Sequence, residues 1–136
     1  MRMSERKNLI AVYGTLRQGC GNHRYHLSEA EFMGTFNSEP VYSMFSLGGF
    51  PGLTNEGNTS IVMEVYNVND EEADSVDGLE GYIPGQEPHF YDKQSIETPW
   101  GTASIYIYVR NTNGLRLVEN GDWINRNERV VHERVL

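Results

Sequence analysis

The alternation of apolar and polar residues along the chain predicts mostly strands. Apolar runs at residues 8–13 and 60–68 predict buried strands. Residues 92–97 and 102–109 flank a turn-forming Thr-Pro-Trp-Gly segment, which predicts a hairpin. Two further strands are expected at residues 30–36 and 41–47, followed by a loop at 48–52. The tail at 115–136 is ambiguous, and Val130, Val131 and Val135 could form a last strand there.

Residues 69–79 carry the pattern of a helix. Asn69 is expected to cap its N-terminus, with Glu72 completing a capping box three residues later. Acidic residues 70–72 lie where the helix dipole favours negative charge. Gly81 is placed to end the helix.

Strands therefore outnumber helices, and we expect an α+β fold in a single domain, residues 1–136. Residues 22–28 predict one short helical turn, capped by Asn22. A closed or half-closed small mixed β-barrel, flanked by the short helices, would remove exposed strand edges.

Composition narrows the classes of partner. The net charge of −8 argues against nucleic acid, whose binding needs clustered Lys and Arg. No apolar run approaches the roughly 20 residues of a membrane span, and no signal-peptide core follows the basic N-terminus. Cys20 is the single cysteine of the sequence, so no internal disulfide can form and a reducing, cytoplasmic location is expected. The oligomeric state is not readable from these features.

Glu80 is the first candidate for chemistry. Ala73, Val76 and Leu79 define the apolar stripe of the predicted helix, and the spacing puts Glu80 on the same stripe. A carboxyl group on a core-facing side has a raised pKa, which suits acid–base catalysis. The alternative is a helix that frays by Leu79, with Glu80 pointing to water.

The segment Tyr13-Gly14-Thr15-Leu16-Arg17 is the second candidate. A glycine directly after a buried strand allows a tight turn whose N–H groups converge on an anion. The spacing of the glycines matches neither the P-loop nor the dinucleotide-binding fingerprint. The alternative is an ordinary glycine turn with Arg17 at the surface.

Four segments, in this order, resemble the gamma-glutamylcyclotransferase-like family, including its gamma-glutamylamine branch. They span nearly the whole chain. They are Val12-Tyr13-Gly14-Thr15-Leu16-Arg17, the strand and Pro-Gly loop at 42–53, Leu79-Glu80-Gly81-Tyr82, and Asn120-Gly121-Asp122-Trp123.

The resemblance implies a small mixed barrel and an enzyme that cleaves a gamma-glutamyl amide. The substrate's own α-amino group attacks the γ-carbonyl, which gives 5-oxoproline and a free amine without metal or cofactor. Glu80 then corresponds to the catalytic general base and acid. The remaining binding positions correspond to Tyr13, Gly14, Thr15, Leu16, Arg17, Tyr82 and Tyr91.

One position departs from the family pattern. The family usually carries an aromatic residue and an arginine two positions apart, whereas this chain has Tyr91 and Lys93 after a longer insert at residues 83–90. Lysine lacks the planar fork of arginine, so substrate preference or activity is expected to differ. A non-enzymatic domain that binds a small ligand or a partner is therefore kept as the alternative.

Other polar residues are weaker candidates. Glu64 is expected at the rim or in a structural role rather than as a second catalytic carboxylate. His23 and His26 are too few for a metal site, and Cys20 is expected to be an ordinary loop residue. A phosphate-binding enzyme would need more basic partners than Arg17 and Arg24.

Overall fold

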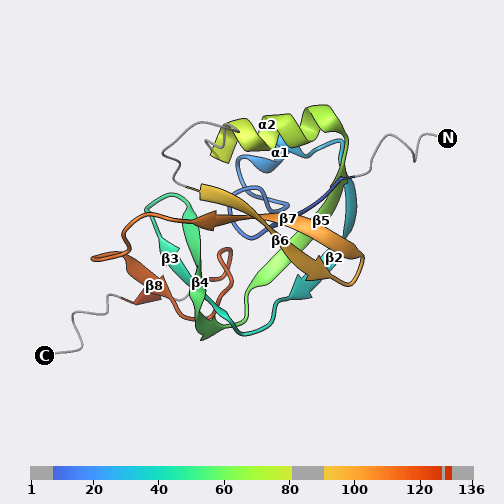
Figure 1. The fold of residues 1–136 in the computed structure, drawn as a ribbon. Coiled ribbons are helices and arrows are strands. Elements are labelled where there is room, and N and C mark those ends of the chain that lie inside the picture. Colours follow the sequence, from blue (N-terminus) through green and yellow to red (C-terminus); the bar gives the residue numbers. More distant parts are fainter. Residues whose placement is uncertain (1–7, 81–90, 127, 130–136) are drawn as a thin grey trace, which may run out of the picture.

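A computed structural model describes residues 8–80, 91–126 and 128–129, and their strands form two sheets (Figure 1). The five-stranded sheet has the order β2-β5-β1-β7-β6. Its members are β2 (Glu31–Asn37), β5 (Val62–Val68), β1 (Asn8–Val12), β7 (Gly101–Tyr108) and β6 (Tyr91–Thr98). The β1–β7 pair is parallel and the other pairs are antiparallel.

The second sheet has four strands in the order β4-β3-β8-β9. They are β4 (Pro51–Thr59), β3 (Tyr42–Ser46), β8 (Arg116–Val118) and β9 (Glu128–Arg129). The α+β class is confirmed, but the expected closed barrel is wrong for the described residues. The two sheets share no strand, so they stack instead of closing into a cylinder.

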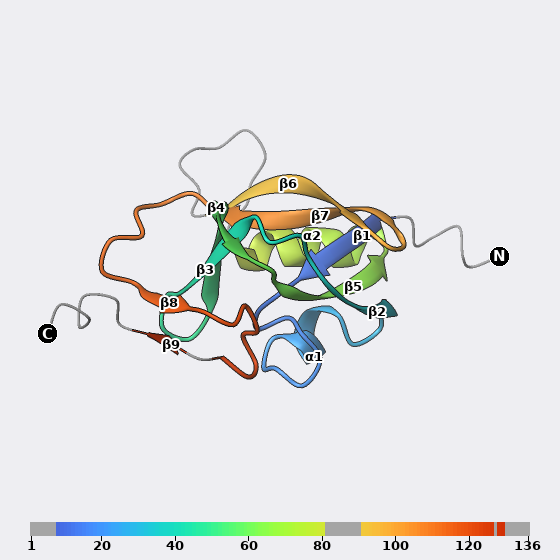
Figure 2. The ribbon, with the colours of Figure 1, turned by 90° about the horizontal axis from the view of Figure 1, so that it is seen from below.

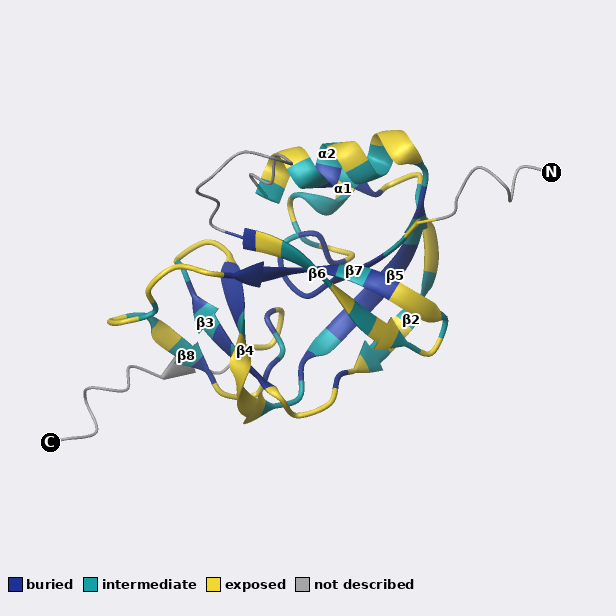
Figure 3. Ribbon diagram, in the orientation of Figure 1, coloured by how far each residue is buried: buried dark blue, intermediate teal, exposed yellow. Residues whose placement is uncertain are grey.

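The five-stranded sheet is the middle layer (Figures 1 and 2). Helices α1 (His23–His26) and α2 (Asp70–Glu80) lie over one face, where Val76 packs with Ile10, Val12 and Val68. The other face packs against the second sheet. Figure 3 shows the result, with buried residues on the central strands and exposed ones along the outer side of α2. None of the described helices is long and apolar enough to cross a membrane.

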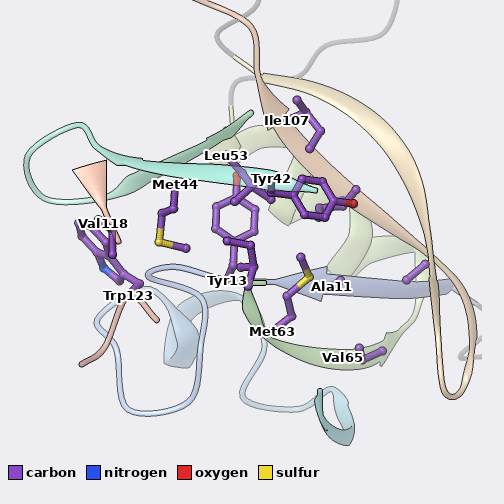
Figure 4. Packing of buried hydrophobic residues seen from close by; sticks show 13 residues of the cluster. Ala11, Tyr13, Tyr42, Met44, Leu53, Met63, Val65, Ile107, Val118 and Trp123 are labelled. Atoms are coloured by element: carbon purple, nitrogen blue, oxygen red, sulfur yellow. The ribbon is translucent and has the colours of Figure 1, made fainter. Parts of the chain in front are cut away.

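The core between the sheets is centred on Tyr13, at the end of β1. Its ring lies among Tyr42, Leu53 and Met63 (Figure 4). Leu53 and Met63 are completely buried. The first turn after β1 is therefore fixed to both sheets through this one aromatic side chain.

The predicted capping box is confirmed. The Asn69 amide N–H donates to Glu72 Oε1 at 2.9 Å, and the Glu72 amide N–H donates to Asn69 Oδ1 at 2.7 Å. These bonds satisfy two N–H groups that a helix start leaves unpaired. Asn22 also lies at the predicted N-cap position of α1, but its side chain makes no cap bond there. The side-chain Nδ2 of Asn22 instead donates to Thr15 Oγ1 at 2.8 Å.

The loop expected at residues 48–52 is wrong at its end, because Pro51 and Gly52 begin β4. Proline disrupts an inner strand but is tolerated at the first residue of an edge strand, which is its place here. Gly52 is required by a close approach, because a Cβ there would lie 2.8 Å from Tyr108 Cγ.

The hairpin of β6 and β7 is confirmed, and it is buried more fully than alternation suggests. Ile105 and Ile107 pack in the core between the sheets, and Tyr106 and Tyr108 on the opposite side of the strand are also buried. Helix α2 and the neighbouring strands cover this second face. The three valines expected near the C-terminus lie outside the described residues.

Candidate functional site

The end of α2 and the turn after β1 meet at one cavity of about 200 Å³. This volume is below the roughly 300 Å³ at which pockets for drug-sized ligands begin, so it suits a small substrate. The walls come from the turn, from the segment that starts β4, and from β6 and β7. The lining residues are Ala11, Val12, Tyr13, Gly14, Thr15, Leu16, Asn22, Gly49, Phe50, Pro51, Leu79, Glu80, Tyr91 and Tyr106.

Glu80 is the last residue of α2 and lies half-buried at this cavity. Val76, one turn earlier, is completely buried and holds the helix on the sheet. Removal from water raises the pKa of the Glu80 carboxyl to about 7, and the negative charge of Asp77 adds to the effect. Such a carboxyl group can both take up and release a proton near neutral pH.

The turn after β1 is closed by its own hydrogen bonds. The Arg17 amide N–H donates to the Gly14 carbonyl at 3.0 Å, and the Asn22 amide N–H donates to the Thr15 carbonyl at 3.2 Å. Within the described residues, no hydrogen bond from the amide N–H of Thr15 or Leu16 is present. These two donors are therefore available to a ligand in the cavity.

Two tyrosines form fixed walls. The Tyr13 hydroxyl donates to the Tyr106 carbonyl at 2.5 Å, and the Tyr91 hydroxyl donates to the Pro51 carbonyl at 2.7 Å. Burial raises the pKa of both phenols above the ordinary range, with nearby groups adding to the effect. Both rings thus stay neutral, and their hydroxyl hydrogens are committed to the backbone.

Arg17 does not reach the cavity. Its guanidinium is buried, with Nε 3.1 Å from Glu64 Oε2 and Nη1 2.8 Å from Asp122 Oδ1. Glu64 Oε1 also accepts from the Gln18 amide N–H and from the Tyr66 hydroxyl, each at 2.8 Å. The expectation of an exposed or substrate-binding Arg17 is replaced by a buried ion pair, and Glu64 has the structural role that was expected.

Lys93 is also absent from the cavity walls. Its Nζ lies 3.0 Å from Asp77 Oδ2, and the Tyr106 hydroxyl donates to the other oxygen of Asp77. Asp77 is a residue of this site that was not predicted from the sequence. The available signal was its position three residues before Glu80, which places both carboxyl groups on neighbouring parts of one helix face.

Of the residues expected at the site, Tyr13, Gly14, Thr15, Leu16, Glu80 and Tyr91 share the cavity. Tyr82 and the insert at 83–90 lie outside the described residues. Burial, the largest effect, raises the pKa of Cys20, so its thiol is not activated as a nucleophile. His23 Nδ1 lies 3.0 Å from the Leu16 carbonyl oxygen, which gives this histidine a structural contact.

Comparison of sequences places the chain among known proteins. Residues 10–125 match the family model "Gamma-glutamyl cyclotransferase, AIG2-like". A putative gamma-glutamylcyclotransferase of Vibrio cholerae is 41% identical over 120 residues, which cover 88% of this chain and 98% of the relative. The gamma-L-glutamyl-butirosin B gamma-glutamyl cyclotransferase of Niallia circulans is 32% identical over 84% of this chain and 74% of its own.

The Escherichia coli gamma-glutamylcyclotransferase family protein YtfP is 37% identical over 119 residues, which cover 88% of this chain and 98% of YtfP. Its solution structure superimposes with a TM-score of 0.67 over 86% of this chain and 96% of that one. A crystal structure of an uncharacterized protein from Pyrococcus horikoshii gives a TM-score of 0.71 at 25% identity, covering 86% of this chain and 90% of that one. The match over 10–125 and these relatives show that the chain belongs to the gamma-glutamyl cyclotransferase, AIG2-like family and is an enzyme of that kind.

Proposed function

We propose that this enzyme releases 5-oxoproline and a free amine from a gamma-glutamyl amide, with Glu80 as general base and then general acid. The observation that carries the proposal is the position of Glu80. Its carboxyl group, with a pKa of about 7, lines the same small cavity as the turn Gly14–Thr15–Leu16. A base poised near neutral pH and a set of amide donors are the two parts that this reaction needs.

The reaction balances without water or a cofactor. The Glu80 carboxylate takes a proton from the α-ammonium of the substrate. The freed amine then forms a bond to the γ-carbonyl carbon. As the tetrahedral intermediate collapses, Glu80 gives this proton to the leaving nitrogen and the original amide C–N bond breaks. The attacking nitrogen still carries one extra proton, which the Glu80 carboxylate then moves to the released amine. The lactam is therefore neutral at nitrogen, the amine leaves as an ammonium ion, and Glu80 ends ionised as it began. Because the nucleophile and the electrophile belong to one substrate molecule, the enzyme mainly has to hold the glutamyl group of the substrate in the conformation that closes the ring.

The turn supplies that orientation. The amide N–H groups of Thr15 and Leu16 hold the α-carboxylate of the glutamyl group or the oxyanion that develops on the γ-carbonyl. The neutral rings of Tyr13 and Tyr91 exclude water around the reacting atoms. Exclusion of water also strengthens the electrostatic interactions within the cavity.

The cavity favours a leaving amine without its own carboxylate. Among the described lining residues there is no Lys, Arg or His, and Glu80 adds negative charge. The carboxylate of a leaving amino acid would therefore be desolvated without a cation to pair with. Phe50 and Leu79 line the same cavity with partly exposed apolar side chains, which offer apolar contact to the leaving amine instead. We therefore assign a gamma-glutamyl amine as substrate.

The test is a panel of gamma-glutamyl amines and gamma-glutamyl amino acids, with released 5-oxoproline as the measured product. The wild type is expected to turn over the amines with the higher kcat/KM. Glu80→Gln is nearly isosteric and should fold normally but lose at least about 100-fold in kcat. Glu71→Gln makes the same chemical change at an exposed position of α2 and should keep full activity.

Two results would contradict the proposal. Full turnover by Glu80→Gln would show that Glu80 does not carry the proton. A folded wild type that binds members of the panel and releases no 5-oxoproline from any of them would support the binding-domain alternative.

A further inference from the structure

Asp77 lines a second hollow, which is separate from the substrate cavity but shares Tyr106 with it. Tyr106 lines both spaces. The second hollow contains Asp77 and Lys93, which the proposed reaction does not use. Asp77 is therefore a half-buried acidic group next to the candidate site, and the proposed reaction leaves it without a role.

The Asp77 carboxylate is held from two strands. The Tyr106 hydroxyl, from β7, donates to Oδ1, and the Lys93 ammonium, from β6, lies 3.0 Å from Oδ2. The side chain of Asp77 is only 14% exposed, against 29% for Lys93. Asp77 precedes Glu80 by three residues, which puts the two carboxyl groups next to each other along one side of α2.

We propose that Asp77, anchored by Lys93 and Tyr106, is a positioning residue that sets the charge state of Glu80 through space. This inference rests on the proposed function of Glu80 as the proton carrier. Asp77 does not touch the reacting atoms. It acts by placing a fixed negative charge one helical turn from the catalytic carboxyl group.

The groups around Glu80 leave Asp77 as its main charged neighbour. From the turn after β1, from β6 and from β7, the facing titratable groups are Tyr13, Tyr91 and Tyr106. Burial keeps the first two phenols neutral. Among the described lining residues of the cavity there is no cationic side chain.

Asp77 has charged neighbours of its own. Besides Lys93 and Tyr106, the second hollow is lined by Asp70 and Asp74 of α2 and by the neutral Asn8 and Ser104. Asp70 accepts a hydrogen bond from Asn8 Nδ2 at 3.0 Å. Lys93 is the one cationic side chain among the described residues that line this hollow, so it offsets part of the acidic charge of α2.

The arrangement predicts opposite effects for two substitutions that break the same ion pair. Asp77→Asn removes a negative charge near Glu80 and makes its ionisation easier. Lys93→Gln removes the compensating positive charge and makes its ionisation harder. A merely structural ion pair would respond to both substitutions in the same way, by loss of stability or of kcat.

The experiment measures the pH profile of kcat/KM for the wild type and the variants. In Asp77→Asn we expect the acid limb of the profile to shift to lower pH by about one unit. In Lys93→Gln we expect the acid limb to shift to higher pH by a smaller amount. Lys93→Arg keeps the positive charge at this position, so its acid limb should stay at the wild-type pH. Glu71→Gln, an equal charge change at an exposed residue of α2 that lines neither space, should leave the limb in place.

A second readout does not need activity. Carbon-13 NMR of the glutamate carboxyl groups, with the Glu80 signal assigned by its loss in Glu80→Gln, follows the titration of Glu80 directly. Opposite shifts of that titration in Asp77→Asn and Lys93→Gln support the proposal even if no substrate is turned over. An unmoved titration in both variants, or shifts in the same direction, would overturn it. Should Asp77→Asn fail to fold, the direction of the shift in Lys93→Gln decides alone.

Discussion

Glu80 destabilises the folded protein by the same property that suits it to proton transfer. Its pKa is about 7 in the folded chain, against 4.5 for an exposed glutamate. Between these two values the folded state binds a proton more tightly than the unfolded state does. The stabilising effect of that proton is complete below about pH 4.5 and is lost as the pH rises through 7.

Glu80→Gln is therefore expected to make the protein more stable at alkaline pH. The amide cannot ionise, so at about pH 8 the variant should unfold with a free energy about 1–2 kcal/mol higher than that of the wild type. The difference should shrink as the pH falls from 7 and approach zero below about pH 4.5, where the wild-type carboxyl group is mostly protonated in both states. Urea denaturation of both proteins at several pH values measures it. A difference that does not change with pH would show that Glu80 titrates as an exposed carboxyl group.

At the scale of elements, the cavity depends on the close approach of the first turn to the start of β4. A Cβ on Gly14 would lie 2.6 Å from Pro51 Cγ and 2.7 Å from Pro51 Cδ. The Pro51 carbonyl in turn accepts the Tyr91 hydroxyl. Any displacement of Pro51 is therefore passed on to a second wall of the cavity.

Gly14→Ala should separate the turn from β4 and enlarge the site. Because the turn amides would no longer face Glu80 at the right distance, we expect kcat/KM for 5-oxoproline release to fall by about 10–100-fold. The free energy of unfolding should fall by about 1–3 kcal/mol, as for an overpacked core position. Gly21→Ala, in the same loop, is the matched control, because its new Cβ would meet nothing within 4 Å. Equal losses of activity and stability in the two variants would mean that the effect at Gly14 does not come from its contact with Pro51.

Some of these elements could be predicted from the sequence and others could not. The helix α2 and the hairpin of β6 and β7 follow from local signals, namely the Asn69–Glu72 capping box and the turn residues at 98–101. Strand β4 was missed because Pro51 and Gly52 are typical of loops, and an edge position that tolerates them is a tertiary property. The Arg17 ion pairs join residues 47 and 105 positions apart, a separation beyond any local pattern.

For the whole molecule, Arg17 connects parts of the chain that no single element brings together. Its guanidinium joins the turn after β1 to Glu64 on β5 and to Asp122 in the segment after β8. That segment is also attached to the start of β5, because the Val62 amide N–H donates to the Gly121 carbonyl at 2.9 Å. The ion pairs thus link the candidate site to both sheets.

Arg17→Met should destabilise the fold more than the loss of a surface contact would. Without the guanidinium, the buried Glu64 carboxylate keeps its two neutral donors but loses its countercharge, which costs about 3–5 kcal/mol of unfolding free energy. Adding Glu64→Gln removes the uncompensated charge while Oε1 can still accept from Gln18 and Tyr66. The double variant should therefore recover a large part of the loss, and denaturant titration of the two single variants and the double variant measures the coupling.

Arg24→Met is the matched control for this series. Arg24 is exposed and lies over the Tyr25 ring at 5.3 Å, so its replacement should change the unfolding free energy by no more than about 0.5 kcal/mol. If Arg17→Met is as mild as this control, the network does not hold the sheets together. If the double variant is no more stable than Arg17→Met alone, an unpaired Glu64 charge is not the cause of the loss. The stability recovered by adding Glu64→Gln tests the electrostatic explanation separately from the loss of packing, because Arg17→Met and the double variant carry the same methionine.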